Sequence, residues 1–546
     1  MRTLTIMLLI WATIAVFSLS MACLLPITQD EAYYWIWGHQ LQWGYLDHPP
    51  GVALSAYLSS WQNQALLNGR LFVVLTALCT ATVLARLYWI SLSHRRHWIQ
   101  ALLLVLGSFG FLLNSFLLTP DHLLAFFWAL ALHESYLALT QNRRRWIGAG
   151  AALGLGLMCK YTMILMAPIF LITIWTLDRR SLRSPWPYIG ALIAVLVLFP
   201  HLAWNRDNNW VTSQFQLSHR FATDQGIKDQ SQGDGTGEDD PFAKSRIETT
   251  LSPLERGLKD EKKTALQTAL HAEPIKKPLL LLPKFLVRFI EYWGGLLLLW
   301  GGLLYLVLKT TYQRRTCFKP VFLKSKLQGK GRLPLIFYGS GALIPVLFFA
   351  GISLFSKVEA NWTGMYILSA APLLAPYLHA RQRTLLGILG AHFLILLALV
   401  LHTYHPFLPT GADRLLRETR GYPQLAAHVK DLNGEIFAET YQDISMVRFY
   451  NSPSLQIKQW SGRKRPSEYL RNGASSLPEE PFWLLLNEDS PQFRKNLRIK
   501  EARILIDCRD GAFYDVPYMS RHRAKPCQTP IHTWMLVQYE NLGGRL

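Results

Sequence analysis

Runs of about twenty apolar residues recur along this chain and limit it to one class of fold. A helix of that length crosses the roughly 30 Å hydrocarbon core of a bilayer. The apolar residues are continuous along each run and do not form the amphipathic stripes of a soluble core. We therefore predict an α-helical polytopic membrane protein with about eleven transmembrane helices. The expected spans are residues 5–25, 71–92, 98–118, 123–140, 147–159, 162–177, 187–203, 283–308, 334–355, 363–378 and 385–404.

The first run resembles a signal peptide, because Met1 and Arg2 precede an apolar stretch that ends near Cys23. A polar, aromatic segment and ten further spans follow it. We therefore expect it to remain as an uncleaved membrane anchor.

The basic residues alternate between the loops. Nineteen Lys and Arg residues, against the single acid Asp178, lie ahead of the first span or in every second loop. This is the positive-inside pattern, which predicts a cytoplasmic N-terminus and, with an odd number of spans, an outward C-terminus. The net charge of +20 is thus an orientation signal and does not indicate nucleic-acid binding.

The outward segments are then residues 26–70, 119–122, 204–282 and 356–362, together with a junction at 159–161. Asp30 and Glu31 stand directly behind the first span, where charged groups are read as functional. Trp35, Trp37, Trp43 and Tyr45 form either an aromatic belt at headgroup depth or a platform for a sugar.

The span before Lys160 is short. Its thirteen residues, 147–159, reach only about 20 Å of the apolar core. Lys160 therefore lies below the outer interface or extends its stem toward it.

Two outward regions differ in composition from the spans. Residues 222–277 form a polar insert that we expect to be flexible, because it lacks the apolar residues of a core. From Gly411 the hydropathy falls, and residues 411–546 predict an α/β domain. The helices are expected at 422–432 and 442–450, and the strands at 435–440, 455–460, 482–486, 503–507 and 534–539. Cys508 and Cys527 both lie in this domain, where a disulfide is possible.

Acids and bases collect on the outward side in separate loops. Carboxylates there can accept a proton from a hydroxyl, and cations can stabilise a departing phosphate. The acids are Asp30, Glu31 and Asp121, and the bases are Lys160, Arg206, Arg220 and Lys357. The pattern favours transfer chemistry on a lipid-bound phosphate.

Several outward motifs resemble one family. Asp30-Glu31-Ala32-Tyr33-Tyr34-Trp35 and Asp47-His48-Pro49-Pro50-Gly51 resemble the first outer loop of the bacterial GT-C glycosyltransferases, specifically the protein O-mannosyltransferase and lipid A aminoarabinose transferase group. Thr119-Pro120-Asp121, Lys160-Tyr161, Trp204-Asn205 and residues 357–362 are similar to further landmarks of that group. The resemblance covers about residues 1–405, and Ala438-Glu439-Thr440-Tyr441-Gln442 resembles the start of its outer domain.

The resemblance implies a GT-C-like catalytic domain over residues 1–405 and an inverting transfer of a sugar from a polyprenyl phosphate. It implies Asp30 as the general base, with Glu31 orienting the site or replacing it and Asp121 assisting. The expected substrate-binding residues are Tyr34, His48, Lys160, Tyr161, Arg206, Arg220, Lys357, Glu359 and Asn361. Aminoarabinose transferases carry Lys where this chain has His48, which weakens that assignment because neutral His is a weaker phosphate partner.

Most of these residues also have a simpler structural interpretation. Asp30 and Glu31 can cap a helix or pair with a nearby Arg. Asp121 can cap the helix that follows it, and Lys160 can simply extend its charge to the interface. Arg206 and Arg220 can contact lipid headgroups, and His48 can be a turn residue. Lys357, Glu359 and Asn361 can form a polar turn between two spans.

We therefore predict a glycosyltransferase of the bacterial inner membrane, with its C-terminal domain in the periplasm. Its partners would be the bilayer, a polyprenyl-phosphate sugar and a lipid, glycan or protein acceptor. A transporter or flippase of a lipid-linked envelope precursor is the alternative, although it predicts mid-membrane charges and repeated halves that we do not find. A non-catalytic sensor or scaffold is a third hypothesis. No cofactor or metal motif is evident, and a divalent cation bridging Asp30 and the phosphate stays an open possibility.

Overall fold

The computed structural model describes most of the membrane region and most of the C-terminal domain. The described residues are 2–60, 67, 69–92, 95–221, 283, 332–354, 358, 361–378, 382–407, 413–460, 467–471, 480–487, 497–518, 527 and 529–541. The predicted insert 222–277, nearly all of the predicted span 283–308, and Lys357 and Glu359 lie outside them.

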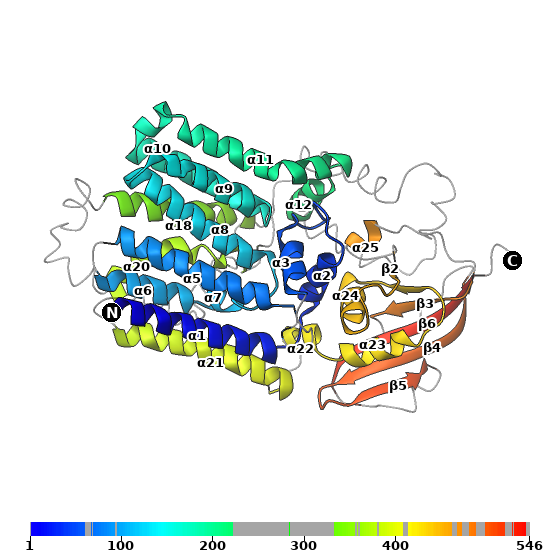
Figure 1. The fold of residues 1–546 in the computed structure, drawn as a ribbon. Helices are drawn as coiled ribbons and strands as arrows, with labels where there is room; N and C mark the ends of the chain where they lie inside the picture. Colours follow the sequence, from blue (N-terminus) through cyan, green and yellow to red (C-terminus); the bar gives the residue numbers. More distant parts are fainter. Residues whose placement is uncertain are drawn as a thin grey trace.

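Six helices of the described part are long and apolar enough to cross a membrane. They lie side by side as a bundle (Figure 1), and each coincides with a predicted span. They are α1 (Arg2–Leu24), α5 (Leu71–Ser91), α8 (Pro120–Thr140), α11 (Trp186–Asp207), α18 (Arg332–Ser353) and α21 (Gln382–Tyr404). The protein is thus a multi-span membrane protein. Large side chains such as Trp98, Trp128 and Tyr366 fill the interior of the bundle.

Four further predicted spans form shorter or interrupted helices. They are α6 (Arg95–Leu106) with α7 (Phe109–Asn114), α9 (Trp146–Leu157), α10 (Met166–Leu177) behind the 3-10 turn η2 (Tyr161–Leu165), and α20 (Ile367–Leu378) behind α19 (Asn361–Gly364). Local chemistry explains one break, because Ser108 leaves the helical conformation and its hydroxyl caps α7 through Phe111 N–H at 3.2 Å.

Helices α9 and α11 approach each other closely through small residues. A Cβ at Gly150 would lie 2.0 Å from the carbonyl oxygen of Gly190, so only glycine fits there. The two helices run together toward the end of the bundle that faces the C-terminal domain (Figure 1), which is the outer end of the predicted topology. The turn after α9 and the last turns of α11 lie there.

Short helices separate the bundle from the C-terminal domain (Figure 1). They are α2 (Gln29–Gly38), α3 (Gly51–Ser59) and α12 (Val211–Phe221). Helix α2 begins with a capping box, in which Thr28 and Glu31 satisfy each other's backbone N–H groups. The capping box sets the first turn of α2, which carries Asp30 and Glu31.

The C-terminal domain is a mixed sheet with helices. Its helices are α22 (Arg414–Thr419), α23 (Tyr422–Lys430), α24 (Tyr441–Tyr450) and α25 (Glu468–Arg471). Its strands are β1 (Ile436–Ala438), β2 (Ile457–Gln459), β3 (Phe482–Leu486), β4 (Leu497–Cys508), β5 (Phe513–Pro517) and β6 (Pro530–Asn541). They are ordered β2-β1-β3-β6-β4-β5, and β1 pairs in parallel with β2 and β3 while the other pairs are antiparallel.

Apolar side chains cover both faces of this sheet. Residues of α23 and α24 pack with Trp483, Leu505 and Trp534 in one cluster, and Phe437 and Phe482 belong to a second. All five predicted strands and both predicted helices are present. The sequence reading missed β5, which pairs with β4 to form the antiparallel edge.

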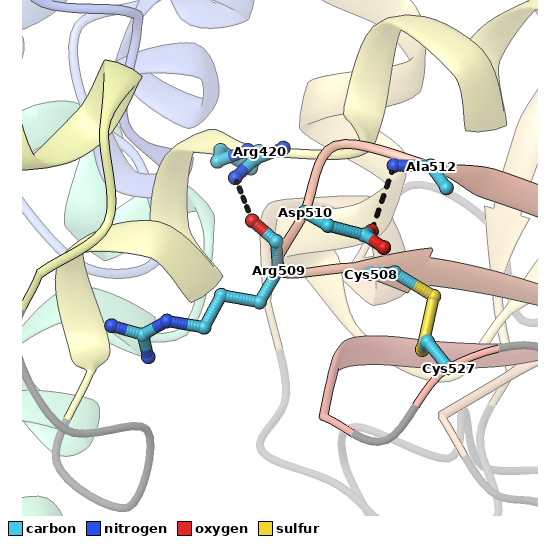
Figure 2. Close-up of a disulfide and its surroundings, with 6 residues drawn as sticks. All are labelled: Arg420, Cys508, Arg509, Asp510, Ala512 and Cys527. Carbon is cyan, nitrogen blue, oxygen red and sulfur yellow. Dashed lines mark hydrogen bonds between the residues drawn. A yellow bond between two sulfur atoms is a disulfide. The ribbon is translucent and has the colours of Figure 1, made fainter.

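A disulfide joins Cys508, the last residue of β4, to Cys527 ahead of β6 (Figure 2). The two Cα atoms are 6.1 Å apart. The pairing that the sequence left open is therefore present. Beside it, an Arg420 N–H group donates to the carbonyl oxygen of Arg509 at 3.2 Å, which ties the loop after α22 to the end of β4.

Candidate active site

Arg70 anchors the first outer loop to the bundle. Its Nε and Nη2 donate to the two carboxylate oxygens of Glu31 at 2.7 and 2.6 Å. Its remaining N–H groups donate to the carbonyl oxygens of Ala22, Leu25 and Pro26. All five guanidinium donors are therefore used, and the side chain is fully buried.

Glu31 is equally saturated. Besides Arg70, it accepts the backbone N–H of Leu118 at 2.8 Å and that of Thr28 at 3.1 Å, and it is 1% exposed. The pair joins the end of α1, the start of α2 and the turn before α8. A carboxylate whose lone pairs are filled by fixed donors has little capacity to accept a proton from a substrate. Glu31 therefore suits the orienting role rather than that of the base.

Asp30, its neighbour, has the opposite environment. Its side chain is exposed, and Oδ1 accepts a hydrogen bond from the Tyr441 hydroxyl at 3.2 Å. Oδ2 makes no hydrogen bond to the described residues. Asp30 is therefore the member of the acidic doublet that a substrate hydroxyl can reach.

Asp121 and Lys160 form a second buried ion pair. Lys160 Nζ lies 2.7 Å from Asp121 Oδ1, and the two residues are 6% and 3% exposed. Within the described chain this is the one contact of the ammonium group, so two of its three donors are unused. Lys160 is therefore buried within the protein and carries spare donors there.

Unused acceptors and donors lie in the adjoining sequence. The hydroxyl oxygens of Thr119 and Thr162 are buried and find no partner among the described residues. Each residue is two positions from a member of the ion pair along the chain. Buried polar groups are normally satisfied, so this region has hydrogen-bonding capacity for a ligand or water.

The first outer loop encloses the start of α8. Glu31 holds Leu118 from one side, and Ser55 of α3 donates to His122 Nε2 at 2.9 Å from the other. The same loop reaches the turn that carries Lys160, because Gly51 N–H donates to the Met158 carbonyl at 2.8 Å. A Cβ at Gly51 would lie 2.7 Å from Cys159 Sγ, so only glycine permits this approach. The motifs that begin at Asp47, Thr119 and Lys160 therefore converge.

Tyr161 belongs to a hydrogen-bonded cluster that also includes His201 and Asn205 of α11. His201 of α11 donates from Nδ1 to the Trp43 carbonyl at 2.7 Å, and its Nε2 accepts the Tyr161 hydroxyl at 2.6 Å. Asn205, one turn later, lies 3.0 Å from the same nitrogen. Trp204 packs over Gly44, where a Cβ would lie 2.4 Å from its ring. The end of α11 thus fixes both the first loop and the residue after Lys160.

Helix α12 returns over the same loop. Asn209 and Trp210 have positive φ values of 56° and 58°, a conformation that reverses the chain after α11. As a result the Thr212 hydroxyl donates to the Tyr45 carbonyl at 2.6 Å, and the Gln216 amide donates to the Asp47 carbonyl. The loop that contains the Asp47–Gly51 motif is therefore held from several sides.

The other predicted site residues make fewer contacts with Asp30, Asp121 and Lys160 in the described part of the chain. Tyr34 and His48 are half-buried, with their rings 5.9 Å apart, and the His48 carbonyl accepts Tyr45 N–H in a turn. Arg206 is exposed and pairs with its neighbour Asp207 at 3.0 Å. Arg220 and Asn361 lie in helices, and their side chains, like the residues Lys357 and Glu359, are outside the described part.

The C-terminal domain contributes directly to this end of the bundle. Glu468 N–H donates to the Tyr33 hydroxyl at 2.9 Å, and Leu46 N–H donates to the Glu468 carboxylate at 2.9 Å. Burial raises the pKa of Tyr33 well above its usual value, and the nearby charges of Asp47 and Glu468 raise it further. Tyr33 therefore stays protonated, as a neutral group between loop and domain.

Glu418 of α22 also lies near the acidic doublet. Burial raises the pKa of Glu418, its partner Arg414 opposes that effect, and the charges of Asp30 and Glu31 add to it. An exposed acid, a buried acid and a third carboxylate from the outer domain thus lie close to one another.

Sequence reasoning missed the partners that decide these roles. Arg70 carried a usable signal, because an Arg directly before an apolar run on the outward side departs from the positive-inside pattern. His201 carried another, because it lies four residues from Asn205 inside a predicted span. Tyr441 lies in the motif that resembles the start of the family's outer domain, but that motif gave no indication of a contact with Asp30. Glu468 carried no signal. Among the described residues no group of three or more His, Cys, Asp or Glu could hold a metal ion.

Comparison with known proteins agrees with this architecture. Residues 47–204 match the family described as dolichyl-phosphate-mannose-protein mannosyltransferase. Over 197 residues, 35% of this chain, the protein is 29% identical to the lipid A galacturonosyltransferase RgtD of Rhizobium johnstonii. The aligned region spans 41% of that relative's length.

The fold matches a solved structure over nearly the whole chain. The apo structure of ArnT from Cupriavidus metallidurans superimposes with a TM-score of 0.55 at 12% identity, covering 98% of each chain. The structure of the same protein bound to undecaprenyl phosphate gives 0.55 at 12% identity and covers 94% of this chain and 98% of the other.

The chain is thus a multi-span membrane protein with a C-terminal mixed-sheet domain, and its fold is similar to that of ArnT. The resemblance predicted from the motifs, to the group of GT-C glycosyltransferases that contains the protein mannosyltransferases and the lipid A aminoarabinose transferases, is confirmed.

Proposed function

We propose that the protein is an inverting glycosyltransferase that moves a sugar from a polyprenyl phosphate, such as undecaprenyl phosphate, to an acceptor hydroxyl. One observation carries the proposal: Lys160 is a buried cation at the outer end of the bundle, and among the described residues its ammonium group contacts Asp121 alone. A buried charge is costly, and a partly used one suits a site that an anion completes. The phosphate of a polyprenyl-phosphate donor is such an anion.

The reaction needs two groups on opposite sides of the sugar. Asp30 accepts the proton of the acceptor hydroxyl while the oxygen of that hydroxyl forms a bond to C1 of the sugar. The bond between C1 and the phosphate oxygen breaks, and its electron pair leaves on the phosphate. Attack opposite the leaving group inverts the configuration at C1. Lys160 binds the developing charge on the phosphate.

Asp121 has a supporting role in this scheme. Its carboxylate holds the Lys160 ammonium in place before the donor binds, at 2.7 Å. The anchored pair also keeps an otherwise isolated buried cation compensated while the site is empty.

The comparisons support this function. The matching family is described as dolichyl-phosphate-mannose-protein mannosyltransferase, and the relative RgtD as a lipid A galacturonosyltransferase. We assign the protein to the bacterial inner membrane, with its C-terminal domain and site facing the periplasm. Lipid A is the first acceptor to test, followed by other envelope glycans and proteins.

Transfer by the purified protein tests the proposal. With a labelled polyprenyl-phosphate sugar and lipid A, we expect release of free polyprenyl phosphate together with a glycosylated product. Asp30→Asn should lower kcat by at least about 100-fold, because general-base catalysis contributes roughly 10²–10⁴. Asp207→Asn, which changes an exposed acid on the same side, should match the wild type.

Two results would contradict the proposal. Near-normal turnover by Asp30→Asn would remove Asp30 as the base. Movement of the intact donor across a liposome membrane without release of its phosphate would indicate a flippase instead.

A further inference from the structure

The motif at the start of the outer domain has no role in the mechanism so far. Its Tyr441 is the first residue of α24 and is 8% exposed. Although it lies 411 positions away along the chain, its hydroxyl donates to Asp30 Oδ1 at 3.2 Å. The proposed base therefore receives a hydrogen bond from a domain that follows all of the membrane spans.

The position of Tyr441 is fixed by the sheet. Thr440 caps α24 by accepting Asp443 N–H at 3.2 Å. The Asp443 carboxylate in turn accepts Trp534 Nε1–H of β6 at 3.2 Å and an Asn487 amide hydrogen at 2.7 Å. The first turn of α24 is thus tied to β6 and to the residue that follows β3, and Tyr441 has little freedom to move.

Contacts on both sides of Asp30 hold α2 against the domain. Gln29 donates to the Tyr422 hydroxyl and, at 3.3 Å, to the Arg417 carbonyl. One turn after Asp30, the Tyr33 ring lies 4.5 Å from the Tyr441 ring, measured between centroids. The Asp30 backbone is therefore held by neighbours, and the Tyr441 hydroxyl sets the remaining degree of freedom, the direction of the carboxylate.

We infer that Tyr441 is a positioning residue that orients the Asp30 carboxylate, so that the outer domain completes the active site. The inference rests on the proposed function. Tyr441 occupies Oδ1 and leaves Oδ2 available for the acceptor hydroxyl. An exposed aspartate without this bond samples other rotamers, and misplacement of a catalytic group lowers the rate of the chemical step.

Tyr441→Phe tests the inference because it removes the hydroxyl and keeps the ring that packs on Tyr33. We expect kcat for sugar transfer to fall about ten-fold, with KM for the polyprenyl-phosphate sugar nearly unchanged. Tyr422→Phe is the matched control. It removes a hydroxyl at the same contact between α2 and the domain, one that bonds Gln29 rather than the carboxylate, and should keep the wild-type kcat.

A double-mutant cycle separates positioning from general loosening of the domain. In an Asp30→Asn background, Tyr441→Phe should cause no further loss, because the group that it orients no longer acts as a base. If that background is too slow to measure, the comparison of Tyr441→Phe with Tyr422→Phe decides.

The inference fails if Tyr441→Phe has the wild-type kcat, if Tyr422→Phe loses as much, or if the loss recurs at the same factor without the Asp30 carboxylate. Wild-type activity in Asp30→Asn would instead refute the proposed base itself. A wild-type protein with no transfer activity would overturn the function and the inference together.

Discussion

Two buried ion pairs at the outer end of the bundle look alike in composition but differ in how fully they are used. Arg70 donates all five of its N–H groups to protein acceptors, and Glu31 is bonded by three different residues. Lys160 has one partner among the described residues, Asp121. The first pair is complete without a ligand, whereas the second has capacity left.

This difference gives a criterion for distinguishing charged residues that stabilise the fold from charged residues that can bind a ligand. Saturation marks a group that holds the fold, because any change leaves buried donors or acceptors without partners. Spare capacity marks a group that a ligand can complete. The same criterion separates Glu31 from Asp30, although they are adjacent in sequence and share one helical turn.

The largest loss of stability is expected when the Arg70–Glu31 pair, whose hydrogen-bonding groups are all used, is broken. Arg70→Lys keeps the charge but loses the fork that reaches the Ala22, Leu25 and Pro26 carbonyls and both Glu31 oxygens. Leaving such groups unpaired typically costs about 3–5 kcal/mol. We expect low yield and a clearly lower unfolding temperature in detergent. A variant as stable as the wild type would show that the saturation criterion fails.

The second largest effect is expected on the rate of sugar transfer, when Lys160 is replaced. Lys160→Met should lower kcat about 10²–10³-fold through loss of phosphate stabilisation. It also leaves the Asp121 carboxylate buried without a cation, so some stability is lost. Adding Asp121→Asn should restore the unfolding temperature but not the activity. Recovery of both would mean that the pair is structural, as Glu31–Arg70 is.

The buried carboxylate of Asp507 extends the comparison, because it forms no ion pair within the described part of the chain. Asp507 is 3% exposed, and its Oδ2 finds no hydrogen-bond partner in the described part of the chain. Burial raises the pKa of Asp507 from 3.8 to about 6, Arg420 opposes the rise, and Asp510 adds to it. The stability that protonation of Asp507 provides is complete below about pH 4 and is lost as the pH rises through about 6.

The smallest effect is expected on the way the unfolding temperature depends on pH. Asp507→Asn should remove this loss, so the gain in unfolding temperature over the wild type should be larger at pH 8 than at pH 5. The difference between the two proteins is the useful quantity, because burial lowers the pKa of His532 to about 4 and that group acts in the opposite direction. An equal difference at both pH values would contradict the raised pKa.

Hydropathy was sufficient to predict the six full-length membrane helices of the described residues. Six predicted spans are full-length helices, and the short span before Lys160 ends at Leu157, as its limited length indicated. Strand β5 was missed because its residues, Phe513–Pro517, show little alternation and depend on pairing with β4. Period-2 patterning can identify a strand only when one face is clearly apolar.

The sequence pointed to several residues that the structure brings together, but not to the partners that distinguish them. The motifs at Asp30, Asp121 and Lys160 could be recognised one by one. Whether Glu31 or Asp30 is available depends on Arg70, Leu118 and Tyr441, which come from other parts of the chain. The sequence does not show which of these distant residues contacts which acid, so only the folded structure separates the two acids.

The most direct test is a structure of the Asp30→Asn variant in nanodiscs with undecaprenyl phosphate bound. The account predicts a phosphate oxygen within hydrogen-bond distance of Lys160 Nζ, about 3 Å, with the phosphate on the side of the site that residue 30 faces. A phosphate bound elsewhere, with Lys160 still held by Asp121 alone, would contradict it.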